Sequence, residues 1–262
     1  MHNFPVTSVP PATGKLRLLQ EGNSCFLKLF ARKCEEHGLR YWLDYGTLLG
    51  AIRHKGFIPW DDDLDVSMMR SDYDRLLELL PVLFPREQGF HWNQHAFLQI
   101  GYEGTPMNLD VYPYHFSADT YSPHVADKID GALTRAKKRI ILMGGKLNYR
   151  DKQVQEMIRK EVLDGAECLA EEYAPAIFLS PAVTFTKNSV FPYEAIFPLK
   201  KAQFEGEELN VPNHSRQHLA FYFGDYMSYP PYVGYQHPTV EKMVQKEPFE
   251  EDVNRFIDIY GV

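Results

Sequence analysis

Four aspartates crowd the segment WDDDLDVSM, at positions 61, 62, 63 and 65. If a strand begins near Asp63, the side chains of Asp63 and Asp65 point to the same face, while Leu64 and Val66 face a core. Positions two apart on one face lie about 7 Å from each other, a span that one or two hydrated Mg²⁺ (or Mn²⁺) ions can bridge. Unpaired carboxylates so placed would repel each other. The spacing therefore predicts a divalent-cation site, with Asp61, which has the same parity, as a candidate outer ligand.

Other residues with suitable chemistry lie on either side of this segment. Asp110 stands in the apolar stretch MNLDVYPY, where an unpaired charge would be costly, so it either joins the metal site or is a buried or edge acid paired with an arginine. Gly46 and Thr47 stand at the head of a short expected helix. Their backbone N–H groups can bind a diphosphate, although a simple strand-to-helix turn gives the same pattern.

Two cations, Arg53 and Lys55, follow and are candidates to neutralise phosphate, because a guanidinium fork suits phosphate oxygens. His54 between them fits an ordinary surface residue. A second acidic pair, Asp72 and Asp74, provides an internal comparison. We assign it to a solvated helix start, where carboxylates interact favourably with the helix dipole.

The elements that would position these groups follow from periodicity. Apolar residues from 16 to 34 recur at helical spacing, with Gly38 as the expected C-terminal cap. Residues 39–45 predict a strand, 47–53 a short helix, and LDVSM a second strand. Ser71 and Asp74 resemble a capping box for a helix that ends before Pro81.

Further along, residues 90–102 and 107–116 predict two more strands, and periodic apolar residues between 123 and 174 predict two helices. Frequent prolines in the last third predict short irregular elements and surface loops. The expected organisation is a catalytic core over 1–122, a helical subregion over 123–180, and a block over 181–262 that completes the site, all packed as one domain.

Composition narrows the classes of function. The 262 residues are 44% hydrophobic and 24% charged, as in folded proteins, and the net charge of −7 excludes a basic nucleic-acid footprint over the whole surface. Cys25, Cys34 and Cys168 lack metal-ligand spacing and predict reduced thiols. No apolar leader or stretch of about 18 apolar residues is present, so we expect a cytoplasmic protein without a transmembrane segment, with peripheral association at the inner face of the membrane as an option.

The run YWLDYGTLLGAIRHKGFIPWDDDLDVSM resembles the signature of the LicD/fukutin family of phospho-alcohol transferases. The later run IFPLKKAQFEGEELNVPNHSRQHLAFYFGDYMSYPP resembles the C-terminal block of that family. With NLDVYPY between them, the resemblance covers residues from about 40 to 116 and from about 190 to 235.

The resemblance implies an α+β fold of nucleotidyltransferase type, with a small mixed sheet flanked by helices. Transferred by position, Gly46 and Thr47 form the turn that binds the donor, and Asp63, Asp65 and Asp110 are the catalytic, metal-binding carboxylates. Arg53 and Lys55 lie close to the donor. This sequence has Tyr45 where the family often has a small residue.

The implied reaction is metal-dependent transfer of a phospho-alcohol from a cytidine diphosphate donor to a hydroxyl of a cell-surface glycan or glycolipid precursor, with release of cytidine monophosphate (CMP). The expected donor is CDP-choline, and CDP-ribitol and CDP-glycerol are alternatives. Three other classes remain open: a nucleotidyltransferase that releases pyrophosphate, a glycosyltransferase that uses its DxD pair, and a catalytically silent glycan-binding protein.

The expectation of choline depends partly on aromatic residues. Trp60 precedes the acidic run, and five tyrosines gather between 222 and 235, at positions 222, 226, 229, 232 and 235. Aromatic faces attract quaternary ammonium groups, although a structural aromatic cluster is the more common reason for such a concentration. Chemistry assigns no role to Asp225 in the same block.

Overall fold

The structure is a computed structural model that describes residues 10–94, 96–117, 176–179, 190–229 and 244–261, together with scattered positions in 131–157 and 240–242. The helices are α1 (Gly14–Glu36), α2 (Tyr45–His54), α3 (Arg70–Leu83), the short 3-10 helix η2 (Arg86–Gln88), α6 (Tyr193–Ile196), α7 (Ser215–Phe223) and α9 (Phe249–Tyr260). The strands are β1 (Trp42–Leu43), β2 (Leu64–Met69), β3 (Phe90–Gln94), β4 (Leu98–Tyr102), β5 (Asn108–Ser117), β6 (Ala176–Leu179), β7 (Val190–Pro192), β8 (Lys200–Phe204) and β9 (Glu207–Val211).

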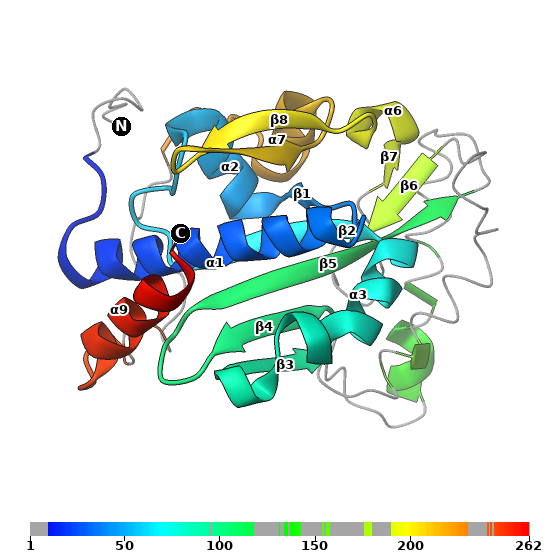
Figure 1. The fold of residues 1–262 in the computed structure, drawn as a ribbon. Coiled ribbons are helices and arrows are strands. Elements are labelled where there is room, and N and C mark those ends of the chain that lie inside the picture. The colour runs from blue at the N-terminus through cyan, green and yellow to red at the C-terminus, as the bar shows by residue number, and fades with distance from the viewer. Residues whose placement is uncertain are drawn as a thin grey trace.

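A mixed sheet forms the centre of the fold (Figure 1). Its main order is β1-β2-β5-β4-β3, with β6 and β7 continuing from the far half of β5. The central pair β2 and β5 is parallel, while the other pairs are antiparallel. In that parallel register Asp65 lies opposite Asp110, so the sheet brings together two acids 45 positions apart.

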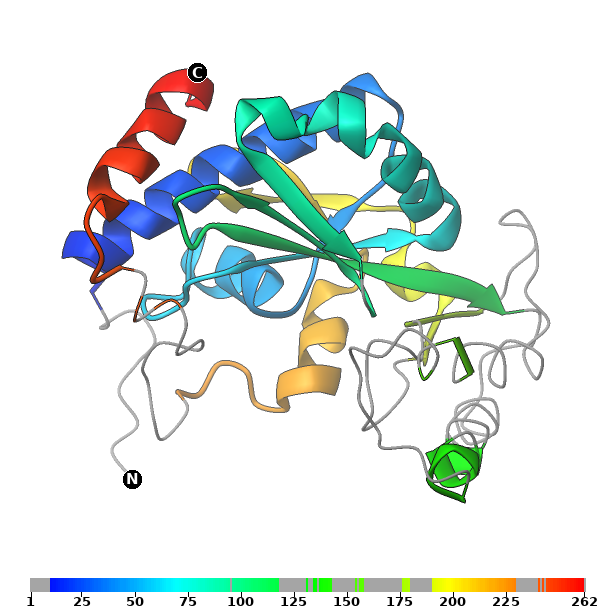
Figure 2. The ribbon, with the colours of Figure 1, turned by 90° about the horizontal axis from the view of Figure 1, so that it is seen from below.

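Helices cover the sheet unequally. In Figure 2, α1, α3 and α9 lie on one side of the sheet and α7 on the other. The larger core includes Phe26, Phe30, Phe84 and Phe256, and it continues to buried residues of α2, β8, β9 and α7. A smaller core, built around Trp42, contains residues of β5, β7 and α6. The mixed sheet flanked by helices confirms the predicted fold class.

Helix α1 follows the sequence prediction closely. Its periodic apolar residues, such as Leu19 and Phe26, are fully buried. Gly38 ends the helix with φ +61, and the N–H of Leu39 donates to the carbonyl of Cys34 at 2.8 Å. This is the 6→1 bond of a Schellman cap, which requires a residue that tolerates the left-handed conformation. The predicted cap is confirmed.

Several boundaries differ from the predictions. The strand predicted over 39–45 is reduced to β1, and Tyr45 already belongs to α2. Residues 90–102 form two antiparallel strands, β3 and β4, rather than one, because a turn divides them. Helix α3 continues through Pro81 to Leu83. The ring removes one helical hydrogen bond, but burial of Leu80 and Leu83 offsets this loss. The start of α3 has Met69 as its N-cap without a side-chain hydrogen bond, so the predicted capping box is wrong.

The C-terminal region contains more regular structure than its proline content predicts. Pro192 and Pro248 are the N-caps of α6 and α9, and Pro212 directly follows β9. The prolines therefore separate elements instead of preventing them. Helix α9 buries Phe249, Val253 and Phe256 and packs against α1.

The predicted helical subregion, 123–180, falls largely outside the described residues. Within it, residues 137–142 are helical and β6 joins the main sheet. Cys25 and Cys34 are free thiols, as predicted, whereas Cys168 lies outside the described residues. Among the helices that the structure describes, none combines the length and the apolar character needed to cross a membrane.

Candidate active site

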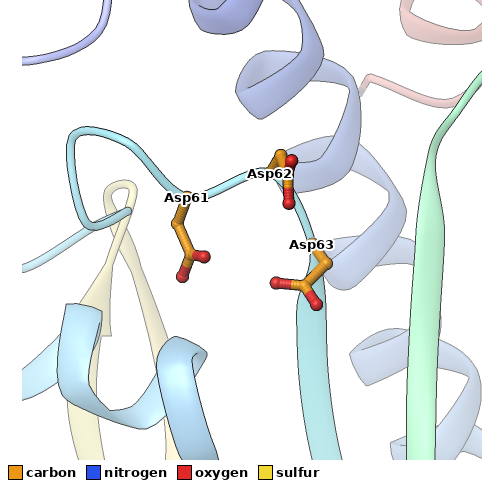
Figure 3. Close-up of side chains that lie close together, drawn as sticks. All are labelled: Asp61, Asp62 and Asp63. Atoms are coloured by element: carbon orange, nitrogen blue, oxygen red, sulfur yellow. The ribbon is translucent and has the colours of Figure 1, made fainter. Parts of the chain in front are cut away.

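The acidic loop that enters β2 presents a group of carboxylates. Oxygen atoms of Asp61, Asp62 and Asp63 lie within 4.8 Å of one another. Figure 3 shows the carboxylates of Asp61 and Asp63 directed into the same space. Asp62 is fully buried, and Asp63 is partly exposed. Hard oxygen ligands so close together are the donor set that Mg²⁺ or Mn²⁺ prefers.

Asp65 extends this group from β2 and is held by the start of α2. Its Oδ2 accepts a hydrogen bond from the Gly46 N–H at 3.2 Å, and its own backbone N–H donates to Thr47 Oγ1 at 2.8 Å. A Cβ at Gly46 would lie 2.8 Å from Asp61 Oδ2 and 3.5 Å from Asp65 Oδ2. The position therefore needs glycine because two carboxylates converge on it. Thr47 is buried, and its hydroxyl orients Asp65.

Asp110 completes the acidic group from β5. Its Oδ1 accepts hydrogen bonds from Gln99 Nε2 at 3.0 Å and from Asn108 Nδ2. The Tyr112 hydroxyl lies 3.1 Å from Asp65 Oδ1 and 3.4 Å from Asp110 Oδ2, and thereby joins the two acids. Tyr112 was not predicted from the sequence, although strand alternation places it on the same face as Asp110.

The electrostatics of Asp65 fit a bound cation. Burial, followed by the charges of Asp63, Asp110 and Asp61, raises the pKa of Asp65 well above its ordinary value. The negative charge of this side chain is therefore disfavoured in the protein by itself, and a divalent cation among the same oxygens would stabilise it. The residues present thus fit the metal that the family resemblance implies.

Two polar residues of α1 hold the acidic loop from behind. Gln20 Nε2 donates to the carbonyls of Ile58 and Asp61 at 3.3 and 3.0 Å, and Asn23 Nδ2 donates to the carbonyl of Asp62 at 3.0 Å. Both side chains are buried in an otherwise apolar helix face. They satisfy backbone groups of a buried loop, which would otherwise lose their hydrogen bonds to water.

A cavity of about 650 Å³ opens over the acidic group. Asp61, Asp63 and Asp65 form part of its lining. Aromatic side chains supply much of the remainder, namely Tyr45, Trp60, Tyr112, Phe223, Tyr226 and Tyr229. The ring of Trp60 lies 5.4 Å from that of Tyr229. Acid and aromatic surface in one cavity suit a ligand with an anionic part, bound through cations, and a second part that contacts rings.

The basic segment at the end of α2 lies between two cavities, and Arg53 lines both of them. Arg53 lines the acidic cavity, where its Nη1 donates to the carbonyl of Tyr226 at 2.6 Å and its guanidinium lies 5.7 Å from the centre of the Tyr229 ring. Burial, followed by the charge of Arg53, lowers the pKa of His54 to about 4, so His54 is neutral and accepts from Arg53 Nε at 2.9 Å. Lys55 lines a second, neighbouring cavity, and does not line the acidic one.

The predicted contrast between the two acidic pairs needs one correction. Asp72 was assigned to a solvated helix start, but its side chain is buried and pairs with Arg40 at 2.8 Å. Asp74 is the exposed member and pairs with Arg70. Packing of α3 turns Asp72 inward, and a buried carboxylate requires a partner.

The C-terminal tyrosines have different surroundings. Tyr226 and Tyr229 line the acidic cavity, and Tyr222 packs against Tyr45 with ring centres 4.8 Å apart. Tyr232 and Tyr235 lie outside the described residues. Asp225 also lines the cavity and accepts a hydrogen bond from Ser228 Oγ at 2.5 Å, so it stabilises the turn that carries Tyr226 and Tyr229.

Sequence reasoning also missed a buried pair behind the cavity, Asp44 and His218. The Asp44 carboxylate caps α2 by accepting the Tyr45 N–H, and His218 Nε2 lies 2.7 Å from Asp44 Oδ1. The sequence placed Asp44 inside the strand predicted over 39–45, whereas in the structure it is the N-cap of α2, a position that aspartate commonly takes. His218 carries no local signal, because its partner is 174 positions away.

Comparison with known proteins finds similarity to a family of phosphotransferases. Residues 38–141 match the sequence model of the family described as LicD/FKTN/FKRP, nucleotidyltransferase domain. The lipopolysaccharide cholinephosphotransferase LicD of Haemophilus influenzae is 29% identical over 260 residues, an alignment that covers 83% of this chain and 94% of that protein. Human ribitol 5-phosphate transferase FKRP is 32% identical over 105 residues, or 36% of this chain and 21% of FKRP. Mouse ribitol-5-phosphate transferase FKTN is 29% identical over 96 residues, with the same shares.

Proposed function

Because this chain belongs to the LicD/fukutin family, we propose that it transfers a phospho-alcohol from a nucleotide-activated donor to a hydroxyl acceptor. The observation that carries the proposal is the convergence of Asp61, Asp63 and Asp65 on one cavity, with Asp110 directly behind. A cytidine diphosphate alcohol is the donor, and a glycan or glycolipid precursor of the cell surface provides the acceptor hydroxyl. CMP leaves.

Asp63, Asp65, Asp110 and the outer Asp61 would hold Mg²⁺ or Mn²⁺. When bound, the cation offsets negative charge on the transferred phosphoryl group and on the leaving nucleotide. Gly46 permits the close approach of the carboxylates, and Thr47 fixes the backbone of Asp65. Arg53 stands at the cavity wall, where its guanidinium can contact donor phosphate.

In the reaction, the acceptor oxygen attacks the phosphorus on the alcohol side, and the bond between that phosphorus and the bridging oxygen of CMP breaks. The acceptor proton passes to a carboxylate, and we assign this role to Asp110, because the Tyr112 hydroxyl ties it to Asp65 beside the cavity. The chain mainly positions the reactants and organises charge.

Choline is the proposed alcohol. The alignment with the cholinephosphotransferase spans most of this chain, whereas the ribitol phosphate transferases align over 36% of it. The rings of Trp60, Tyr226 and Tyr229 line the cavity beside the acids, and such faces bind quaternary ammonium groups. Ribitol and glycerol remain the competing alcohols.

A donor screen tests the proposal. The protein is incubated with Mg²⁺, a glycan acceptor, and in parallel the CDP esters of choline, ethanolamine, ribitol and glycerol, and released CMP is measured. We expect CMP with the choline ester above the others. Preference for a polyol or for ethanolamine would overturn the choice of choline, and release of pyrophosphate from CTP instead would identify a nucleotidyltransferase.

A further inference from the structure

A buried carboxylate and imidazole lie behind the cavity and have no part in the mechanism above. Asp44, directly before α2, and His218, on α7, have fully buried side chains that meet at 2.7 Å. Asp44 Oδ2 also accepts from Ser67 Oγ at 2.6 Å and from the Tyr114 hydroxyl at 3.3 Å. With the Tyr45 N–H on Oδ1, four donors surround one carboxylate.

The hydrogen bonds around Asp44 favour the ionised form of its carboxyl group. Burial acts to raise the pKa of Asp44, but the His218 contact and the hydrogen bonds from Ser67 and Tyr45 hold it below the ordinary value. Asp44 is therefore ionised, and His218 Nε2 donates the proton between them. His218 Nδ1 has no hydrogen-bond partner among the described residues.

Such a network contributes little net stability, because removing a carboxylate from water costs several kcal/mol that its partners only offset. What a fully satisfied buried network does provide is a fixed orientation. In this fold, it also ties α7, from the C-terminal block, to the start of α2.

The start of α2 is also where Asp65 is held. The Asp44 N–H donates to the Asp65 carbonyl at 3.1 Å, and two residues later the Gly46 N–H donates to Asp65 Oδ2. Between them, Tyr45 has φ +42, an unfavourable conformation for a bulky residue. Its ring packs against Tyr112 at 5.0 Å and Tyr222 at 4.8 Å. A strained residue persists only where its surroundings fix it.

We infer that Asp44 and His218 are a positioning pair, which holds Tyr45 in its strained conformation and so sets the Gly46 N–H and Tyr112 against Asp65. The inference rests on the proposed function, since Asp65 is taken as a metal-binding residue there. Neither member of the pair touches the reacting atoms. Docking of α7 thereby completes the site from a distance.

Amide hydrogen exchange of the whole chain, measured without donor or metal, tests whether the pair positions Tyr45 and Gly46. In His218→Leu, we expect the amides of residues 45–49 to exchange at least about tenfold faster than in the wild type. Ser67→Ala removes one donor from Asp44 and should give a smaller change in the same direction. Val253→Ala is the control, because it lowers stability from the α1–α9 core without touching this network.

Activity and metal affinity provide the second readout. His218→Leu should lower kcat and weaken Mn²⁺ binding by about tenfold while the donor KM changes little, whereas Val253→Ala should leave all three unchanged. The inference is overturned if His218→Leu lowers Tm but leaves amide exchange over 45–49 and Mn²⁺ affinity unchanged. The pair would then be purely structural. If His218→Leu does not fold, Ser67→Ala decides by the same criteria. If the wild type releases no CMP from any donor, the proposed function fails, and the exchange comparison still decides the role of the pair.

Discussion

Asp65 lies where β2, β5 and the start of α2 meet, with hydrogen bonds from Gly46 and Tyr112 and three other carboxylates around it. These two hydrogen bonds do not neutralise the charge of Asp65, because each donor carries only a partial positive charge. Its raised pKa is the measurable sign of this imbalance. At the scale of single residues, the site thus gathers carboxylates that repel one another, and a cation bound among them would remove this repulsion.

Replacing Asp65 with Asn should lower turnover by about 100-fold or more and leave the fold intact. Without metal, the variant should also be more stable than the wild type above the ordinary aspartate pKa of 3.8. The folded-state pKa of Asp65 is raised, so its favourable contribution is complete at low pH and is lost as pH rises toward the folded value. Denaturant unfolding across pH and CMP release measure the two effects.

Asp63→Asn should behave similarly in turnover. The matched control is Asp74→Asn, which alters an exposed acid on α3 and should change neither quantity. Asp72→Asn is not a suitable control, because Asp72 is buried against Arg40 and loss of its charge should destabilise the protein. Equal turnover in Asp63→Asn, Asp65→Asn and Asp74→Asn would refute the assignment of the metal-binding residues.

Gly46→Ala is a sharper test of geometry. The new methyl would lie 2.8 Å from Asp61 Oδ2, so this carboxylate must move, and we expect Mn²⁺ affinity and kcat to fall by about tenfold or more with little change in Tm. Gly38→Ala should show the opposite pattern. Its Cβ meets open space, but φ is +61, so stability falls by about 1 kcal/mol while activity is retained. Titration calorimetry with Mn²⁺ distinguishes them.

At the scale of elements, α1 has two tasks. One face buries Phe26 and Phe30 in the core, while Gln20 and Asn23 reach the carbonyls of the acidic loop. The loop is therefore rigid at its backbone although its side chains repel one another. Rigid support of this kind is what a metal site needs, because ligand positions must be set before the cation arrives.

Asn23→Ala should leave the Asp62 carbonyl without its donor and lower the free energy of unfolding by about 1–3 kcal/mol. The same change should weaken Mn²⁺ binding, because the backbone between Asp61 and Asp63 loosens. Ser24→Ala truncates the next residue of the same helix and is the control, since the loop takes its hydrogen bonds from Gln20 and Asn23. An effect on stability alone would limit Asn23 to a role in folding.

The turn after α7 forms the aromatic wall of the cavity. Arg53 holds it through the Tyr226 carbonyl, and Tyr229 faces Trp60. If these rings bind choline, Tyr229→Leu should raise the KM for CDP-choline several-fold, in line with a cation–π contact of about 0.5–2 kcal/mol. The KM for CDP-ribitol should change less. Steady-state kinetics with both donors decide, and equal changes would make Tyr229 a structural residue.

At the scale of the whole molecule, the cavity depends on segments from both ends of the chain. The α2 and β2 region supplies the acids, β5 supplies Asp110 and Tyr112, and residues 223–229 supply the aromatic wall. A cation bound among the acids would act on all of these elements at once, because it removes the repulsion at the point where they meet.

Mg²⁺ or Mn²⁺ should therefore raise Tm. At a concentration 100 times Kd the gain is about 2.7 kcal/mol, or roughly 5–10 °C for a chain of this size. Excess chelator should reverse the shift and stop CMP release, and Asp65→Asn should show neither response. Differential scanning fluorimetry with and without chelator measures this, and full activity in excess chelator would contradict metal dependence.

The sequence by itself determined the parts of the site that depend on local geometry. Alternation along the strand placed Asp63 and Asp65 in the acidic group, helical periodicity and Gly38 defined α1, and the long motif gave the resemblance to the LicD/fukutin family. These follow from contacts between residues a few positions apart. Only the tertiary structure decided that Asp110 lies beside Asp65, that Asp72 is buried, that Lys55 lines the neighbouring cavity and not the acidic one, and that His218 reaches Asp44. Each of these depends on strand register or helix docking between distant segments, and no local pattern encodes which partners such packing brings together.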